Sequence, residues 1–127
     1  VWLNLTGSGN ETFIHLQSVP RMTLMWCSFA KQPQILRVYG NAQCVLPRDD
    51  AWPDYVSLMP EQVGARQFFV VHIEVVQTSC GWGVPEMQLV RERPTLSKFA
   101  QSLGRQGIQA SWTKERPRPK DYIARDE

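Results

Sequence analysis

Residues 68–77 read FFVVHIEVVQ, and this stretch decides the fold class. Aromatic and β-branched side chains fill it, which is the composition of a β-strand. A loop with two glycines, 78–85 (TSCGWGVP), follows it. Upstream, 21–30 (RMTLMWCSFA) and 35–46 (ILRVYGNAQCVL) also have strand character, and the short connection through Pro33 predicts that they pair as an antiparallel hairpin. Gly40 within the second stretch indicates a bulge or a bend.

Helical patterns flank these strands. The first covers 11–19 and ends at Pro20, with Ser8 as its N-cap because Ser8 and Glu11 have the spacing of a capping box. We also expect a strand end at 1–5 and an extended piece at 87–90. Three further helices are expected: a short one from an Asp50 N-cap to Met59, one at 95–103 and a short one at 108–114. The helix at 95–103 has Thr95 as its N-cap and Gly104 as its stop. Hairpin-linked strands with helices at the ends favour an antiparallel barrel or α+β domain over a doubly wound sheet.

Length and composition exclude several classes of protein. The chain has 127 residues, 43% apolar and 20% charged, which suits one globular domain. No apolar run approaches the roughly 18 residues of a membrane helix. The basic excess lies in residues 91–127, which hold nine basic and five acidic side chains and end in a basic, proline-containing tail, 113–127. The folded part carries no dense Lys/Arg stripe, so neither a nucleic acid nor a membrane is expected as a partner.

Cysteine and histidine usage argues against a metal site. Cys27, Cys44 and Cys80 are odd in number and widely spaced, and His15 and His72 stand apart from them. This is neither a disulfide framework nor a zinc pattern. With no signal peptide visible, we expect a reducing, cytoplasmic location. The chain does not begin with Met, which predicts a fragment or a processed product.

Three features could bind a ligand. The small-residue loop 6–10 (TGSGN) precedes a helix, so its backbone N–H groups could hold a phosphate, although a plain capped turn is the alternative and Glu11 disfavours an anion. The loop lacks the lysine of a P-loop. Arg37 interrupts an apolar strand and needs either an anion or a route to water. Residues 77–85 could line a planar aromatic ligand, or Trp82 could cap the core.

Four segments together resemble a known family. They are 3–12 (LNLTGSGNET), 35–40 (ILRVYG), 64–67 (GARQ) and 76–85 (VQTSCGWGVP). They resemble the pyridoxamine 5′-phosphate oxidase-like family, and within it a subgroup of uncharacterised members more than the oxidase itself. The resemblance implies a mainly β (α+β) fold, an FMN-binding split β-barrel with peripheral helices, in residues 1–112. Such barrels have six strands, and the first strands are apparently missing here. The family implies a homodimer with FMN at its interface.

The resemblance also implies site residues. Trp2 and Leu3 would flank the flavin, and Ser8, Gly9 and Asn10 would lie near its phosphate or ribityl chain. The remaining cofactor-binding residues that it implies are Gln34, Arg37, Ser79 and Trp82. No catalytic residue is assigned.

The implied function is that of an FMN-dependent oxidoreductase acting on a small-molecule redox substrate that remains unidentified. The deazaflavin F420 is the alternative cofactor. The alternative functions are a flavin- or cofactor-binding module without turnover and a degenerate interaction protein. Gly9 and Asn10 stand where the oxidase carries a basic pair, and the Arg and His pattern that holds pyridoxal phosphate in the oxidase is not visible. Both departures argue against pyridoxamine oxidation.

Overall fold

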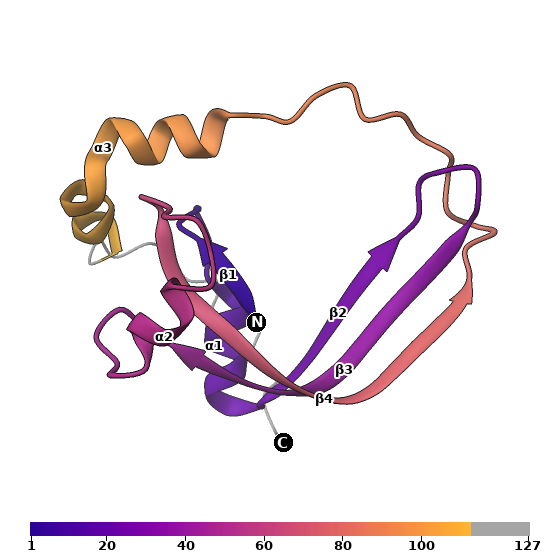
Figure 1. Cartoon of the computed structure of the whole chain (residues 1–127), viewed down its shortest axis with the longest axis horizontal. Helices are drawn as coiled ribbons and strands as arrows, with labels where there is room; N and C mark the ends of the chain where they lie inside the picture. The colour runs from indigo at the N-terminus through magenta and orange to yellow at the C-terminus, as the bar shows by residue number, and fades with distance from the viewer. Residues whose placement is uncertain (113–127) are drawn as a thin grey trace, which may run out of the picture.

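The computed structural model of the chain describes residues 1–112, and the predicted tail 113–127 lies outside the described residues. Four strands and three helices form in that part of the chain (Figure 1). The strands are β1 (Trp2–Leu5), β2 (Arg21–Cys27), β3 (Gln34–Val45) and β4 (Ala65–Cys80), and the helices are α1 (Glu11–Ser18), α2 (Trp52–Val56) and α3 (Thr95–Trp112).

The strands form one antiparallel sheet in the order β1-β4-β3-β2. Figure 1 shows β3 and β4 sweeping through a deep curve, so that the sheet has the shape of half a barrel. This confirms the mainly β, α+β fold with peripheral helices. Of the six strands of a split barrel, residues 1–112 supply four.

The predicted hairpin is confirmed, and so is the bulge at Gly40. β2 pairs with β3 from Arg21 opposite Asn41 to Cys27 opposite Ile35. The register between β3 and β4 shifts between Tyr39 and Gly40. A Cβ atom at position 40 would overlap the carbonyl oxygen of His72, so glycine lets the two backbones approach at this bend.

β4 is longer than the sequence indicated. It runs for 16 residues and includes Thr78, Ser79 and Cys80, which were expected in a loop. These three residues pair with Leu36, Ile35 and Gln34 of β3. The hydrogen bonds that β3 supplies extend the strand through these residues, because strand formation depends on the neighbouring strand as well as on local composition.

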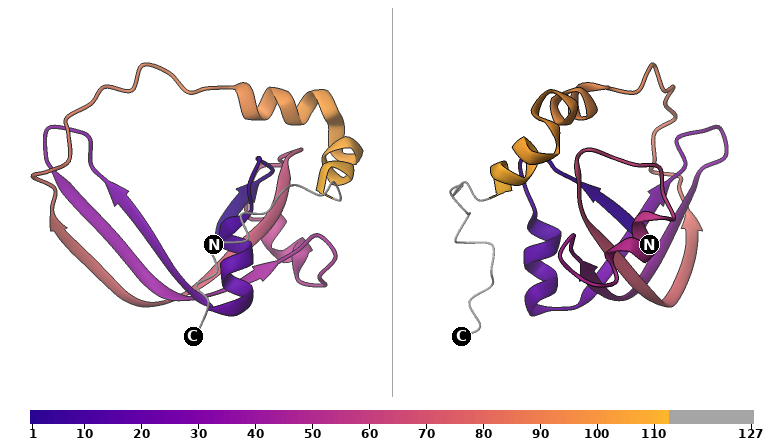
Figure 2. Two further views of the ribbon diagram at one scale, coloured as in Figure 1. Left: turned by 180° about the vertical axis from the view of Figure 1, so that it is seen from behind. Right: turned by 60° about the vertical axis from the view of Figure 1, so that its left-hand side comes forward.

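The core lies in the half of the sheet next to β1. Phe69 and Ala42 form a buried cluster with Leu16 of α1. Phe68 points to the opposite face, where its ring lies 4.9 Å from the ring of Trp52, centroid to centroid. α1 and α2 therefore cover opposite faces of the same half of the sheet (Figure 2).

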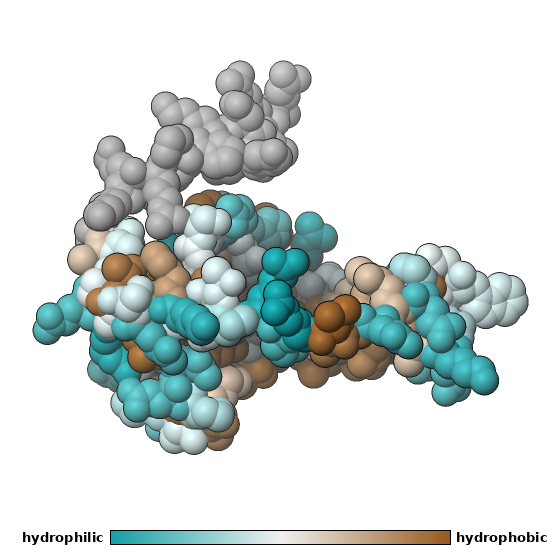
Figure 3. Space-filling view, turned by 90° about the horizontal axis from the view of Figure 1, so that it is seen from above, coloured by the Kyte–Doolittle hydropathy of each residue, from teal (hydrophilic) through white to brown (hydrophobic). Residues whose placement is uncertain are grey.

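The other half of the sheet, which we call the distal half, carries no helix on either face within residues 1–112. Figure 3 shows it from above as an arm that projects from the body and carries both apolar and polar side chains. Its apolar residues include Met25, Ile73, Val75 and Val76, each more than half exposed.

Helix starts differ most from the sequence expectations. Ser8 is not the N-cap of α1: Asn10 holds that position, and its side chain makes no capping bond. Asp50 does not cap α2, which begins after Ala51. Asp49 instead accepts a hydrogen bond from the backbone N–H of Leu46 at 2.8 Å, which closes the turn before the helix.

α3 replaces two predicted short helices. Its backbone breaks at Gly104, which has a φ of 65°, so the predicted stop is real although helix resumes and runs to Trp112. Thr95 lies inside the helix and is not its cap. Residues 87–90 form no strand: they belong to an irregular arch between β4 and α3 (Figure 1). None of the helices in residues 1–112 is long and apolar enough to cross a membrane.

Candidate functional site

The loop 6–10 between β1 and α1 is held at its first residue. Thr6 is buried, and its backbone N–H donates to the carbonyl oxygen of Gly64 at 2.7 Å. The indole Nε1 of Trp112 donates to the Thr6 hydroxyl at 3.0 Å. The loop thus begins from a point fixed by both the approach to β4 and the end of α3.

Asn10 fixes the other end of the loop. Its side-chain oxygen accepts a hydrogen bond from Nε2 of Gln67 at 2.5 Å and a longer one from Nδ2 of Asn4 at 3.4 Å. Gln67 is almost fully buried, with 1% of its surface exposed. Because the Asn10 carboxamide is turned toward β4, it does not cap the first N–H groups of α1.

The positively charged side chain of Arg66 lies against the same loop. Nη1 of Arg66 donates to the carbonyl oxygen of Gly9 at 2.9 Å. Neither Arg66 nor Gln67 was assigned a role from the sequence, although both lie in the segment GARQ. The available signal was a pair of long polar side chains directly before an apolar strand, where burial requires them to find partners.

The loop also carries an opposing charge. The carboxylate of Glu11 folds back over Gly9 and occupies the space that a Cβ atom there would take. The space around Gly7 is open. The donors of the loop and the start of α1 suit a phosphate, whereas the Glu11 carboxylate would repel one. The sequence-based reservation about Glu11 therefore has a structural basis.

The predicted site residues form two groups. The first, which we call the loop group, joins Trp2 and Leu3 of β1 to Ser8, Gly9 and Asn10. The second, the distal group, has Gln34 and Arg37 on β3, Ser79 on β4 and Trp82 in the following turn. Figure 1 places the two groups on opposite arms of the curved sheet, so one copy of the chain does not bring them together.

Within the distal group, Nη1 of Arg37 donates to the hydroxyl of Ser79 at 2.9 Å. Trp82 does not cap the core, because 86% of its surface is exposed. Gly81 before it lies against the hairpin turn, where a Cβ atom would come within 2.7 Å of the backbone nitrogen of Gln34. The glycine thus allows the chain to leave β4 beside Gln34.

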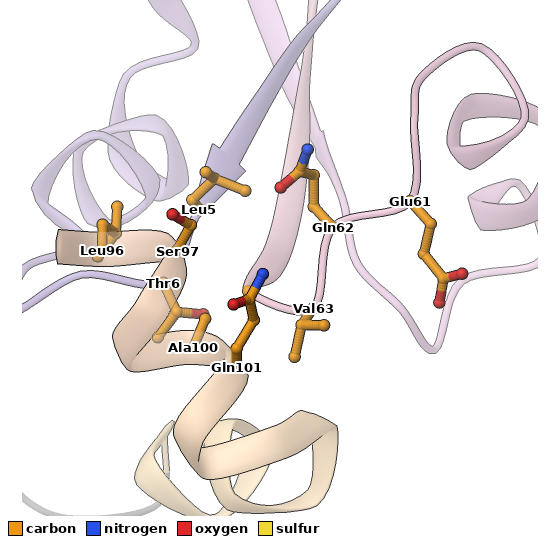
Figure 4. Close-up of a pocket in the computed structure, with 10 residues that line it drawn as sticks. Leu5, Thr6, Glu61, Gln62, Val63, Leu96, Ser97, Ala100 and Gln101 are labelled. Carbon is orange, nitrogen blue, oxygen red and sulfur yellow. The ribbon is translucent and has the colours of Figure 1, made fainter. Parts of the chain in front are cut away.

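A small pocket lies beside the loop group, and Figure 4 shows it between the start of α3 and the strand ends. Its volume is about 80 Å³, and its walls include Thr6, Ser97, Ala100 and Gln101. This volume holds a few water molecules and is far smaller than a flavin needs. This pocket therefore does not hold a flavin.

The thiol of Cys44 lies outside both groups. Burial raises the pKa of the Cys44 thiol, which lies in the α1 side of the core and away from both groups. Within residues 1–112, no three His, Cys, Asp or Glu side chains gather closely enough to hold a metal ion.

One comparison with curated proteins identifies the family. The chain is 36% identical over 114 residues to the pyridoxamine 5′-phosphate oxidase family protein ustO of Aspergillus flavus, and the match covers 79% of this chain and 46% of the relative. The chain belongs to the pyridoxamine 5′-phosphate oxidase-like family. It spans about half the length of the curated relative that it matches. No family model and no solved structure matches it.

Membership in the pyridoxamine 5′-phosphate oxidase-like family confirms the resemblance drawn from the four segments. The curled antiparallel sheet agrees with the split-barrel fold of this family. Members typically bind a flavin. The assignment of individual residues to that flavin stays a prediction.

Proposed function

We propose that this chain binds FMN and acts as a flavin-dependent oxidoreductase on a small-molecule substrate. The proposal rests on family membership and on one observation: the Asn10 side chain is bonded to Gln67 and leaves the first turn of α1 uncapped. The bound flavin would supply the redox chemistry, while the chain binds and orients it.

The loop group suits the phosphate end of FMN. Backbone N–H groups at the start of α1 are donors at the positive end of the helix dipole. Arg66 adds a positive charge next to Gly9 and replaces, from β4, the basic pair that the loop itself lacks. The open space at Gly7 allows close approach of the ligand.

The distal group suits the ring of the flavin, and it reaches the loop group only from a second copy of the chain. We therefore propose a homodimer in which Gln34, Ser79 and Trp82 of one copy flank the flavin whose phosphate the other copy holds. At this interface the second copy would cover exposed apolar side chains on the face of the distal half opposite to Arg37, such as Val76. Because Cys27, Cys44 and Cys80 are all unpaired, we infer a reducing, cytoplasmic location.

An absorbance titration tests FMN binding. We expect flavin bands between about 300 and 550 nm to remain with the protein through gel filtration, at the elution volume of a dimer. A parallel titration with F420 measures which cofactor is preferred. A folded protein that binds neither compound would refute the proposal.

Substitution of Glu11 by glutamine should tighten FMN binding about two- to fivefold. Removal of this carboxylate ends its repulsion of the phosphate near the start of α1, an effect worth about 0.3–1 kcal/mol. Fluorescence quenching of FMN measures the change, and raised salt should reduce it. Riboflavin, which lacks the phosphate, should bind both proteins equally. An unchanged FMN affinity would place the phosphate elsewhere.

A binding module without turnover is the second candidate. The nine predicted site residues include no His, Cys, Asp, Glu, Lys or Tyr, so neither group contains an evident proton donor or acceptor for catalysis. Reduction of bound FMN by NADPH, followed by reoxidation with an added acceptor, would exclude this candidate. Stable binding with neither step would favour it.

A further inference from the structure

The register of the distal half places three rows of three side chains on one face. The rows are Cys27, Ile35 and Ser79; Met25, Arg37 and Gln77; and Thr23, Tyr39 and Val75. Directly opposite residues in antiparallel strands point to the same face. Arg37 lies at the centre, opposite Met25 of β2 and Gln77 of β4. Ile35, opposite Ser79, lies in the next row. Among the polar side chains on this face, Arg37, Gln77 and Ser79 are neighbours, and we call these three the Arg37 patch.

The Arg37 patch is rich in hydrogen-bond donors. Arg37 gives one N–H to the Ser79 hydroxyl at 2.9 Å, and a guanidinium has four more. The hydroxyl of Tyr39 donates to Oε1 of Gln77 at 3.4 Å, which leaves the amide N–H groups of Gln77 as donors. The Ser79 hydroxyl accepts the hydrogen bond from Arg37 and can still donate its own hydrogen.

In the described part of the chain, no carboxylate pairs with the cation of this patch. Arg37 is half-buried and forms no ion pair within residues 1–112. The acidic residue nearest to it along β4 is Glu74, whose carboxylate accepts a hydrogen bond from Asn41. A partly desolvated guanidinium favours an oxyanion, and its planar fork matches a carboxylate.

The flanks of the patch are apolar. Met25 lies on one side of Arg37 with 57% of its surface exposed, and Val75 lies two residues before Gln77 on β4 with 54% exposed. Ile35 closes the row toward the hairpin turn. A ligand that places a carboxylate on the patch would therefore lay an apolar body across these side chains.

We propose that the Arg37 patch binds the carboxylate of the substrate, which is a small carboxylic acid with a flat apolar body. The inference rests on the proposed function, since it assigns Arg37 to the substrate and the loop group to the flavin phosphate. Arg37 and Gln77 would hold the carboxylate, and Ser79 would orient the guanidinium.

The test uses the full chain, labelled with ¹⁵N and ¹³C, and benzoate as the probe. Benzoate should bind saturably and shift the Arg37 guanidinium and Gln77 amide signals. Benzyl alcohol, which has the same ring without the charge, should not. Arg37→Met should weaken benzoate binding at least about tenfold. Arg21→Met is the matched control, because Arg21 lies exposed at the far end of β2, and it should bind benzoate as the wild type does.

A second variant makes the test decisive if the first does not fold. Arg37→Lys retains the charge but loses the planar fork, so it should bind benzoate several-fold more weakly even if Arg37→Met does not fold. Wild-type affinity in both variants, or equal binding of benzoate and benzyl alcohol, would overturn the inference.

FMN and riboflavin affinities separate this inference from the proposed function. If Arg37→Met loses FMN affinity while riboflavin affinity is unchanged, Arg37 holds the flavin phosphate, and the inference fails while the proposed function stands. If the wild type binds no FMN, the proposed function fails whatever benzoate does. Unchanged FMN affinity together with lost benzoate binding supports the inference.

Discussion

Replacing Phe68 by alanine is expected to lower the free energy of unfolding by about 3–5 kcal/mol. Phe68 is fully buried, and its ring lies 4.9 Å from that of Trp52 and 5.9 Å from that of Tyr55, between centroids. The smaller side chain leaves a cavity between β4 and α2 that a rigid sheet cannot close. Urea unfolding, followed by circular dichroism, measures the change.

Leu58→Ala is the matched control for Phe68→Ala. Leu58 follows α2 and has 66% of its surface exposed, so its loss should change stability by no more than about 0.5 kcal/mol. If the free energy of unfolding of Phe68→Ala lies within about 1 kcal/mol of the wild-type value, then α2 does not belong to the core of the folded chain.

Replacing Gln67 by leucine is expected to lower stability by about 1–3 kcal/mol and to weaken FMN binding about tenfold. Leucine is of similar size but donates no hydrogen bond, so the Asn10 carboxamide loses its 2.5 Å partner. Asn10 then retains only the longer bond from Asn4. The loop becomes free to move, and FMN binding must supply the cost of ordering it.

A double-mutant cycle with Asn10→Ala separates this contact from a general loss of packing. The two substitutions should be coupled by about 0.5–3 kcal/mol, because each removes the same hydrogen bond. Gln43→Leu is the control, since Gln43 is an exposed glutamine of the neighbouring β3. Strictly additive effects, or a loss of FMN affinity as large in Gln43→Leu, would show that Gln67 does not position the loop.

Local sequence predicted the strands well and their ends poorly. Residues 68–77 were identified from β-branched and aromatic side chains, and Gly40 was identified as a bulge because its neighbours are strand formers. The extension of β4 through Cys80 was missed, because its hydrogen bonds come from β3, more than 40 residues away in the chain. Strand length depends on the partner, and a partner is not visible in the strand itself.

The capping predictions were wrong for a related reason. Ser8 and Glu11 have the spacing of a capping box, but α1 starts after Asn10. The position of Asn10 is set by Gln67, 57 residues further along the chain. A tertiary hydrogen bond to a buried side chain outweighs a local capping preference of about 1 kcal/mol.

The sequence by itself determined the class of fold, the family and the segments from which a site could be built. These depend on local composition and on motifs whose residues are near neighbours. The tertiary structure alone decided how the segments combine. The pairing of β1 with β4 brings Gln67 under the loop, and the pairing of β3 with β4 brings Arg37 to Ser79. The curvature of the sheet then places the loop group and the distal group on opposite arms of the sheet. Register and twist arise only when distant strands pair, so the sequence of one strand does not show them.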